Sequence, residues 1–226
     1  MGILSKVKKA LKGEKRLLME ENLDLPLKDV LAIIQQRTKK STYFGIPAIK
    51  APTDAWVYQE IIYDMKPDVI IEIGNEQGGS TLMLAHMLDL IGKGKIIGVD
   101  INQSVLYQQV KDHPRITFIE GDACELYDQV TAHLSEGDRI LVIEDSSHTY
   151  DNTLNVLRKY SDLTRVGDYF IVEDSNCHHG IDEGPNPGPY EAIDDFIAST
   201  NKYKIDRSKE SYLITSNPKG FLKRVR

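Results

Sequence analysis

The sequence predicts an α/β protein with a doubly wound, mostly parallel β-sheet that follows an N-terminal helical extension. Two observations predict this fold class. Apolar segments rich in Ile, Val and Phe alternate with helical patterns along most of the chain. Residues 69–80 run from an apolar strand pattern through a glycine-containing turn directly into a helical pattern. Such alternation indicates right-handed crossovers between buried parallel strands.

The elements follow in order from this pattern. Strands are predicted at 68–73, 95–100, 116–120, 139–144 and 168–173, and helices at 80–91, 103–111, 124–134 and 151–164. Two late strands are expected, one near 202–206 and one at either 211–216 or 221–223. Ligands of such sheets bind beyond the carboxyl ends of the strands, so acidic residues at those ends are candidate site residues.

We divide the chain into an extension with a linker, residues 1–52, and a main α/β domain, residues 53–226. The first forty residues read as mostly helical, and Pro26 suits the first turn of a helix over 27–37. Residues 41–52 contain one glycine and two prolines and are expected to form an irregular linker.

Composition excludes several classes of protein. The net charge of −6 argues against a nucleic-acid partner bound through a basic surface. Two cysteines, Cys124 and Cys177, fit a reducing compartment rather than a disulfide framework. No apolar run approaches the ~20 residues that span a bilayer. With no signal-peptide pattern, these features predict a cytoplasmic protein.

The N-terminus shows a short amphipathic pattern. Leu4, Val7 and Leu11 fall at helical spacing among several lysines. Such a helix could make weak contact with an anionic membrane surface, but the apolar face is short and favours a contact within a homo-oligomer or a frayed end.

The glycine turn after the first predicted strand is a candidate cofactor site. A helix N-terminus offers backbone N–H groups and positive dipole charge to a ligand. Glu76 stands where the dinucleotide fingerprint requires its second glycine, which disfavours NAD. The spacing of Gly74, Gly78 and Gly79 is instead typical of sites for S-adenosylmethionine.

The next two strands also end in acids. Asp100 stands at the position that accepts hydrogen bonds from ribose hydroxyls, and Asp122, before Ala123, could accept the amino group of adenine. Each could instead cap a turn or helix. Taken together with the glycine turn, three successive strand ends would contact a single nucleoside.

The fourth and fifth strands end in paired acids, Glu144-Asp145 and Glu173-Asp174. Carboxylates crowded at one edge of a sheet repel one another, and a hard divalent cation with oxygen ligands such as Mg²⁺ relieves this repulsion. The alternative is that one acid of each pair caps a helix and the other faces solvent. His148 follows three residues after Asp145, where it could accept a proton from a hydroxyl held near the cation.

Residues 175–190 form a long loop rich in glycine and proline after the fifth strand, and such loops are often lids or substrate walls. His178, His179 and Tyr190 in this loop are candidate substrate contacts, and the histidines could also serve as bases or metal ligands. No second Cys/His cluster supports zinc beside Cys177.

These motifs resemble, in order, those of class I S-adenosylmethionine-dependent methyltransferases. The more specific resemblance is to the cephalosporin hydroxylase family, which includes rhamnosyl O-methyltransferases. It is carried by the stretches Tyr43-Phe44-Gly45-Ile46-Pro47, Lys50-x-Pro52-x-Asp54-x-x-x-Tyr58, Asp145-Ser-Ser-His148, Gly167-Asp168-Tyr169 and Asn217-Pro218-Lys219-Gly220.

The resemblance implies a Rossmann-like methyltransferase fold and two cofactors, S-adenosylmethionine and Mg²⁺. The implied residues for S-adenosylmethionine are Glu72, Gly74, Gly78, Gly79, Ser80, Asp100, Asp122, Ala123 and Asp145. The implied metal ligands are Asp145, Glu173 and Asp174, and the catalytic residues are His148 and Asp145.

The expected activity is Mg²⁺-dependent O-methyl transfer to a hydroxyl of a sugar, a glycolipid or a small natural product. Two alternatives remain open: a non-catalytic partner protein that binds S-adenosylmethionine, and an NAD-dependent oxidoreductase.

Overall fold

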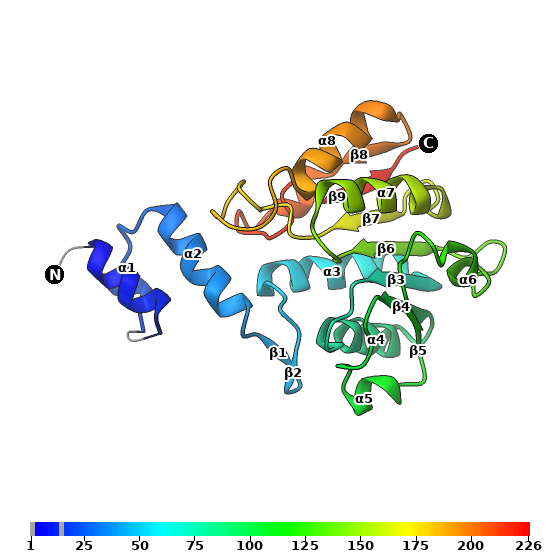
Figure 1. Cartoon of the computed structure of the whole chain (residues 1–226), viewed down its shortest axis with the longest axis horizontal. Helices are drawn as coiled ribbons and strands as arrows, with labels where there is room; N and C mark the ends of the chain where they lie inside the picture. The colour runs from blue at the N-terminus through cyan, green and yellow to red at the C-terminus, as the bar shows by residue number, and fades with distance from the viewer. Residues whose placement is uncertain (1–2, 14–15) are drawn as a thin grey trace.

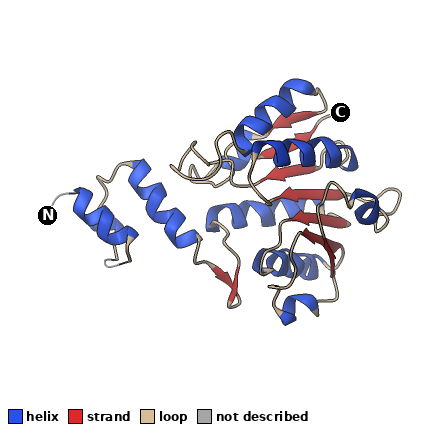
Figure 2. Cartoon of the chain, in the orientation of Figure 1, coloured by secondary structure: helices blue, strands red, loops and turns tan. Residues whose placement is uncertain are grey.

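The computed structural model describes residues 3–13 and 16–226. Its main body is a seven-stranded sheet in the order β5-β4-β3-β6-β7-β9-β8, with helices on both faces (Figures 1 and 2). The strands are β3 (Val69–Ile73), β4 (Lys95–Asp100), β5 (Ile116–Glu120), β6 (Ile140–Glu144), β7 (Tyr169–Val172), β8 (Tyr203–Ile205) and β9 (Phe221–Arg224). The first five are parallel, and β9 runs antiparallel to both neighbours. The predicted fold class is confirmed.

Strand β3 shows how the sheet is buried on both faces. Alternate side chains point to opposite faces of a strand. Ile71 and its neighbours at alternate positions pack in the core that contains Leu157 of α7 (Tyr150–Tyr160) and Ile193 of α8 (Pro189–Ser199). Ile70 packs on the other face in the core that contains residues of α3 (Pro52–Met65) and α4 (Gly79–Ile91). The continuous apolar run in the sequence reflects this two-sided burial.

Two helices are shorter than predicted: α5 covers Gln108–Lys111 and α6 covers Tyr127–Thr131. Before α5, Gln103 is tied to the end of β5, because its N–H donates to Glu120 Oε2 at 2.9 Å and its amide donates to the Ile119 carbonyl at 2.8 Å. Polar contacts of this kind compete with helix formation. Of the two alternatives for the last strand, 221–223 is right and 211–216 is wrong.

The predicted linker contains a small hairpin of β1 (Thr42–Tyr43) and β2 (Ile46–Pro47). Its two turn residues, Phe44 and Gly45, both have positive φ, as a two-residue hairpin turn of type I′ requires. The Tyr43 hydroxyl lies 3.1 Å from His86 Nδ1 and joins the hairpin to α4. The expectation of an irregular linker is therefore wrong, and the hairpin packs with the main body.

Helices α1 (Ile3–Leu11) and α2 (Leu27–Thr38) project from the sheet as an arm (Figure 1). Val7 and Ala10 are buried, whereas the Leu4 side chain is 69% exposed. In the described ranges, no helix is both long and apolar enough to cross a membrane. Residues 1–2 and 14–15 of the predicted extension lie outside the described residues. Membrane contact and oligomer contact through this arm stay predictions.

Candidate active site

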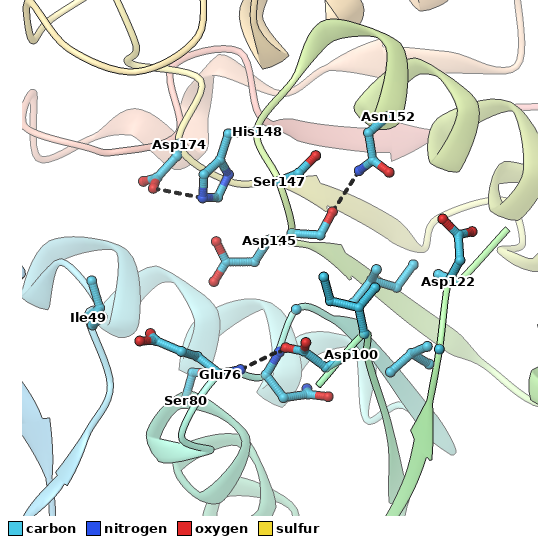
Figure 3. A pocket seen from close by; sticks show the side chains of 18 of the residues that line it. Ile49, Glu76, Ser80, Asp100, Asp122, Asp145, Ser147, His148, Asn152 and Asp174 are labelled. Atoms are coloured by element: carbon cyan, nitrogen blue, oxygen red, sulfur yellow. Dashed lines mark hydrogen bonds and ion pairs between the residues drawn. The ribbon is translucent and has the colours of Figure 1, made fainter. Parts of the chain in front are cut away.

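A cavity of about 440 Å³ opens beyond the carboxyl ends of the central parallel strands (Figure 3). This is where ligands bind in doubly wound sheets. Its lining includes Pro47, Ala48, Ile49, Gly74, Asn75, Glu76, Ser80, Asp100, Asp122, Ala123, Asp145, Ser146, Ser147, His148, Asn152 and Asp174. Eight residues that the sequence predicted for S-adenosylmethionine, the metal or catalysis line this one cavity: Gly74, Ser80, Asp100, Asp122, Ala123, Asp145, His148 and Asp174.

The glycine turn passes so close to its neighbours that side chains are excluded. Gly74 has φ +92°, and a Cβ there would lie 2.0 Å from the Asp145 carbonyl oxygen. A Cβ on Gly79 would lie 2.3 Å from the Pro47 carbonyl oxygen. The turn therefore holds β3, β6 and the hairpin together at the cavity.

Asp100 fixes the same turn from the neighbouring strand. Its Oδ2 accepts hydrogen bonds from the N–H groups of Asn75 at 2.8 Å and Glu76 at 2.9 Å (Figure 3). Its Oδ1 accepts from the N–H of Asn102 at 3.0 Å. The carboxylate faces the cavity, as predicted, and also positions the turn.

Glu72 was predicted to contact the cofactor, but it does not line the cavity. It is fully buried, and its carboxylate accepts hydrogen bonds from Ser80 Oγ at 2.6 Å, Thr81 Oγ1 at 2.5 Å and Asn75 Nδ2 at 2.9 Å. Burial raises its pKa. Glu72 lies under the turn, outside the cavity lining, because these donors occupy its oxygens; Gly78 and Gly79 also lie outside the described lining.

Asp122 combines the two roles that the sequence left open. Its Oδ1 accepts from the N–H groups of Cys124 at 2.8 Å and Glu125 at 3.1 Å, which is a cap of the following turn. It also lines the cavity beside Ala123, whose carbonyl accepts a hydrogen bond from Tyr160 at 2.6 Å.

Asp145, His148 and Asp174 form a cluster at the opposite side of the cavity (Figure 3). One potential ligand atom from each lies within 4.8 Å of the others, and His148 Nε2 is 3.5 Å from Asp174 Oδ2. Burial raises the pKa of both carboxyl groups. Burial alone would lower the pKa of His148, but the nearby carboxylates of Asp145 and Asp174 outweigh it and raise that pKa. His148 and Asp174 both have positive φ, an uncommon backbone conformation outside glycine.

Glu173 is paired with Lys50 beside this cluster. Lys50 Nζ lies 2.5 Å from each of its two carboxylate oxygens and 3.0 Å from Asp145 Oδ2. Within the described residues, Glu173 is outside the cavity lining. In this structure Glu173 forms an ion pair with Lys50, and its role as a metal ligand stays a prediction. Lys50 had no predicted role, although it opens the stretch Lys50-x-Pro52-x-Asp54 that carries part of the family resemblance.

The remaining cluster fits a divalent cation. Two carboxylates and an imidazole converge within bonding reach of one point, and His148 Nδ1 is buried without a hydrogen-bond partner in the described chain. The two carboxylates suit Mg²⁺ and leave the adjacent His148 imidazole to act as a base, whereas an imidazole bound as a third ligand would suit Mn²⁺ equally well.

The predicted lid residues lie outside the described lining of the cavity. His179 stacks on Tyr190 with ring centroids 3.6 Å apart, and its Nε2 lies 2.6 Å from Glu191 Oε1. His178 Nε2 lies 3.1 Å from the Gly184 carbonyl oxygen. These contacts hold the histidines within the loop, so a role for them as ligands or bases requires the loop to move.

Two parts of the lining were missed by the sequence analysis. Pro47 at the end of the hairpin and the next two residues, Ala48 and Ile49, line the cavity, and no local sequence pattern predicts this long-range contact. Asn152 lies one turn after His148 and donates to Ser146 Oγ at 2.7 Å and to buried Glu144 at 3.1 Å (Figure 3). Burial raises the pKa of Glu144 to about 7.

The doubly wound sheet has a Rossmann-like fold that is shared with methyltransferases of known structure. A CmcI structure with Mg-SAM aligns with a TM-score of 0.67 and 24% identity over 83% of this chain and 78% of that one. An O-methyltransferase of Bacillus cereus in complex with SAH aligns with a TM-score of 0.55 and 16% identity over 82% of this chain and 86% of that one.

The comparison of sequences gives the family. The model of the family described as Rhamnosyl O-methyltransferase/CmcI matches residues 35–225. A rhamnosyl O-methyltransferase of Mycobacterium tuberculosis is 35% identical over 190 residues, 81% of this chain and 78% of that protein. One of Mycobacterium leprae is 34% identical over 189 residues, 80% of this chain and 82% of that protein. The chain belongs to the rhamnosyl O-methyltransferase/CmcI family, as its motifs predicted.

Proposed function

We propose that this protein is an S-adenosylmethionine-dependent O-methyltransferase that uses Mg²⁺ and acts on a hydroxyl of a saccharide. The observation that carries the proposal is the arrangement of one cavity between two sets of strand-end residues. Asp100 and Asp122 lie at one side and the Asp145–His148–Asp174 cluster at the other. Family membership and the names of the mycobacterial relatives support the reaction and the saccharide acceptor.

The first side of the cavity would hold the cofactor. Gly74 and Asn75 bring backbone close to it, Asp100 would accept hydrogen bonds from ribose hydroxyls, and Asp122 would accept from the adenine amino group. When bound, S-adenosylmethionine supplies a methyl group on a sulfonium, which leaves as the neutral thioether of S-adenosylhomocysteine. Glu76, whose carboxylate lines the cavity, disfavours the pyrophosphate of NAD by charge.

The second side of the cavity would bind and deprotonate the acceptor hydroxyl. Asp145 and Asp174 would hold Mg²⁺, which when bound lowers the pKa of a nearby hydroxyl. His148 would accept the hydroxyl proton at Nε2, and Asp174, 3.5 Å away, would stabilise the imidazolium that results. Ile49, two residues after the hairpin, would help to exclude water from the cavity.

Transfer of a labelled methyl group tests this function. Purified protein with methyl-labelled S-adenosylmethionine and Mg²⁺ is incubated with a panel of rhamnosides, other glycosides and free phenols. We expect a labelled methyl ether on a saccharide, a loss of product in chelator, and recovery with added Mg²⁺. Label on a phenol alone would contradict the saccharide acceptor, and full activity in chelator would contradict the use of Mg²⁺.

A further inference from the structure

Lys50 places a buried ammonium among the acids of the candidate metal site. Its side chain is 5% exposed, as is that of its partner Glu173, and that of Asp145 is 22% exposed. The residue lies between the hairpin and α3, so it approaches the ends of β6 and β7 from outside the cavity lining.

Asp145 belongs both to the ion pair with Lys50 and to the candidate cation site. Its Oδ2 accepts a hydrogen bond from Lys50 Nζ at 3.0 Å. With His148 and Asp174, it also forms the cluster that fits a divalent cation. Burial alone would lower the pKa of Lys50, but the carboxylates of Asp145, Glu173 and Glu72 outweigh it and raise that pKa. The ammonium lies directly against the carboxylates of Asp145 and Glu173, so its charge is placed at the edge of the candidate cation site.

A fixed positive charge beside a cation site opposes a second cation. The ammonium repels a divalent ion held by the same carboxylate, and this repulsion is strong where water is excluded. Lys50 also neutralises Glu173, so Glu173 can reach a cation only when the ammonium moves away from both of its oxygens.

We propose that Lys50 is a positioning residue that competes with the divalent cation for Asp145 and Glu173, and so keeps that cation weakly held. The proposal rests on the cation site of the proposed function. The proposed role differs from that of a structural ion pair in its effect on the cation. Loss of a structural pair would lower the stability of the protein and leave the affinity of the site for a cation unchanged.

The test measures Mn²⁺ affinity by electron paramagnetic resonance, with the full chain and without an acceptor. We expect Lys50→Met to bind Mn²⁺ at least about tenfold more tightly than the wild type, because one opposing charge is removed. Lys50→Arg, which keeps the charge, should stay weak, and Lys93→Met, whose lysine pairs with Asp68 at the other end of the sheet, should match the wild type. Unchanged or weaker binding by folded Lys50→Met would overturn the proposal.

A second comparison avoids leaving one charge of a buried pair alone, which can prevent folding. Glu173→Gln retains the ammonium on Asp145, and Lys50→Met/Glu173→Gln removes it. The double variant should bind Mn²⁺ at least about tenfold more tightly than Glu173→Gln, and equal affinities would overturn the proposal.

Titration of the same proteins with S-adenosylhomocysteine separates this inference from the function on which it rests. Wild type that binds S-adenosylhomocysteine and Mn²⁺, with variants that do not differ in Mn²⁺ affinity, overturns only the role of Lys50. If the wild type and Lys50→Met both bind S-adenosylhomocysteine and neither binds Mn²⁺, both that role and the metal part of the proposed function are overturned.

Discussion

Asp100 Oδ2 accepts a hydrogen bond from the backbone N–H of Asn75 at 2.8 Å. This bond joins the end of β4 to the glycine turn after β3, so one carboxylate both shapes the turn and faces the cavity. A strand-end acid that the sequence assigned to ribose thus has a second role in the protein without a ligand. Its substitution should affect binding through both roles.

Asp100→Ala should weaken binding of S-adenosylhomocysteine by about 10- to 100-fold, because a charge-assisted acceptor is lost and two N–H groups of the turn lose their partner. Isothermal titration calorimetry checks this. The matched control is Asp128→Ala, an exposed aspartate on α6. Equal losses in the two variants would contradict a specific role for Asp100.

Asp174→Asn should weaken Mn²⁺ binding by about tenfold or more while S-adenosylhomocysteine binding is retained, because one anionic oxygen ligand is lost at the far side of the cavity from Asp100. Paramagnetic resonance and calorimetry on the same sample provide the two readings. Asp182→Asn, in the exposed part of the neighbouring loop, is the control. A loss of cofactor binding without a loss of Mn²⁺ binding would show that Asp174 serves the cofactor instead.

His148→Ala should lower turnover by roughly 10²- to 10⁴-fold with cofactor affinity unchanged, which is the range for loss of a general base. His178→Ala and His179→Ala should retain turnover close to that of the wild type, because these imidazoles contact Gly184 and Glu191 within the loop. Single-turnover rates with labelled cofactor compare the three variants. Wild-type turnover in His148→Ala together with a large loss in His179→Ala would place the base on the lid.

Asp54 should make stability depend on pH. Burial raises its pKa to about 6, although hydrogen bonds from Thr215 and from the Ser216 N–H oppose the shift. An acid with a raised pKa in the folded state binds its proton more tightly there than in the unfolded chain. Its contribution to stability is therefore fully present below the unfolded value near 3.8 and is lost as the pH rises through about 6.

Replacing Asp54 isolates this contribution. As the pH falls from 7.5 to about 4, the free energy of unfolding of the wild type should gain up to ~3 kcal/mol relative to Asp54→Asn. Urea unfolding at several pH values measures the difference, with Asp64→Asn, exposed on the same helix, as the control. Parallel pH curves for the wild type and Asp54→Asn would show that Asp54 does not carry the dependence.

The sequence predicts the sheet well, because a strand buried on both faces requires an unbroken apolar run and the following acids mark its end. The strand over 95–100 agrees with the structure residue for residue. The hairpin could not be predicted in this way: Phe44 adopts a positive φ that its residue type disfavours, and the hairpin is held by contacts with α4 that are distant in sequence.

The sequence predicted those residues of the candidate site that lie at the ends of strands, and it missed most of the others. Asp100 ends β4, Asp122 lies two residues beyond β5 and Asp145 directly follows β6, so all three lie at the carboxyl edge of the sheet and line the cavity. Glu72 and Glu173 are also acids near the ends of strands, but they do not line the cavity. Glu72 accepts a hydrogen bond from Ser80, and Glu173 is paired with Lys50. Those partners come from other segments, and no local pattern reveals them.

The proposed function is tested most directly by measuring which cofactor the protein binds. Titration calorimetry of the purified full chain with S-adenosylhomocysteine, S-adenosylmethionine and NAD, each with and without Mg²⁺, compares the ligands at one site. We expect saturable one-to-one binding of both adenosyl ligands, weakened by Asp100→Ala, and no heat from NAD. Binding of NAD with no response to either adenosyl ligand would contradict it.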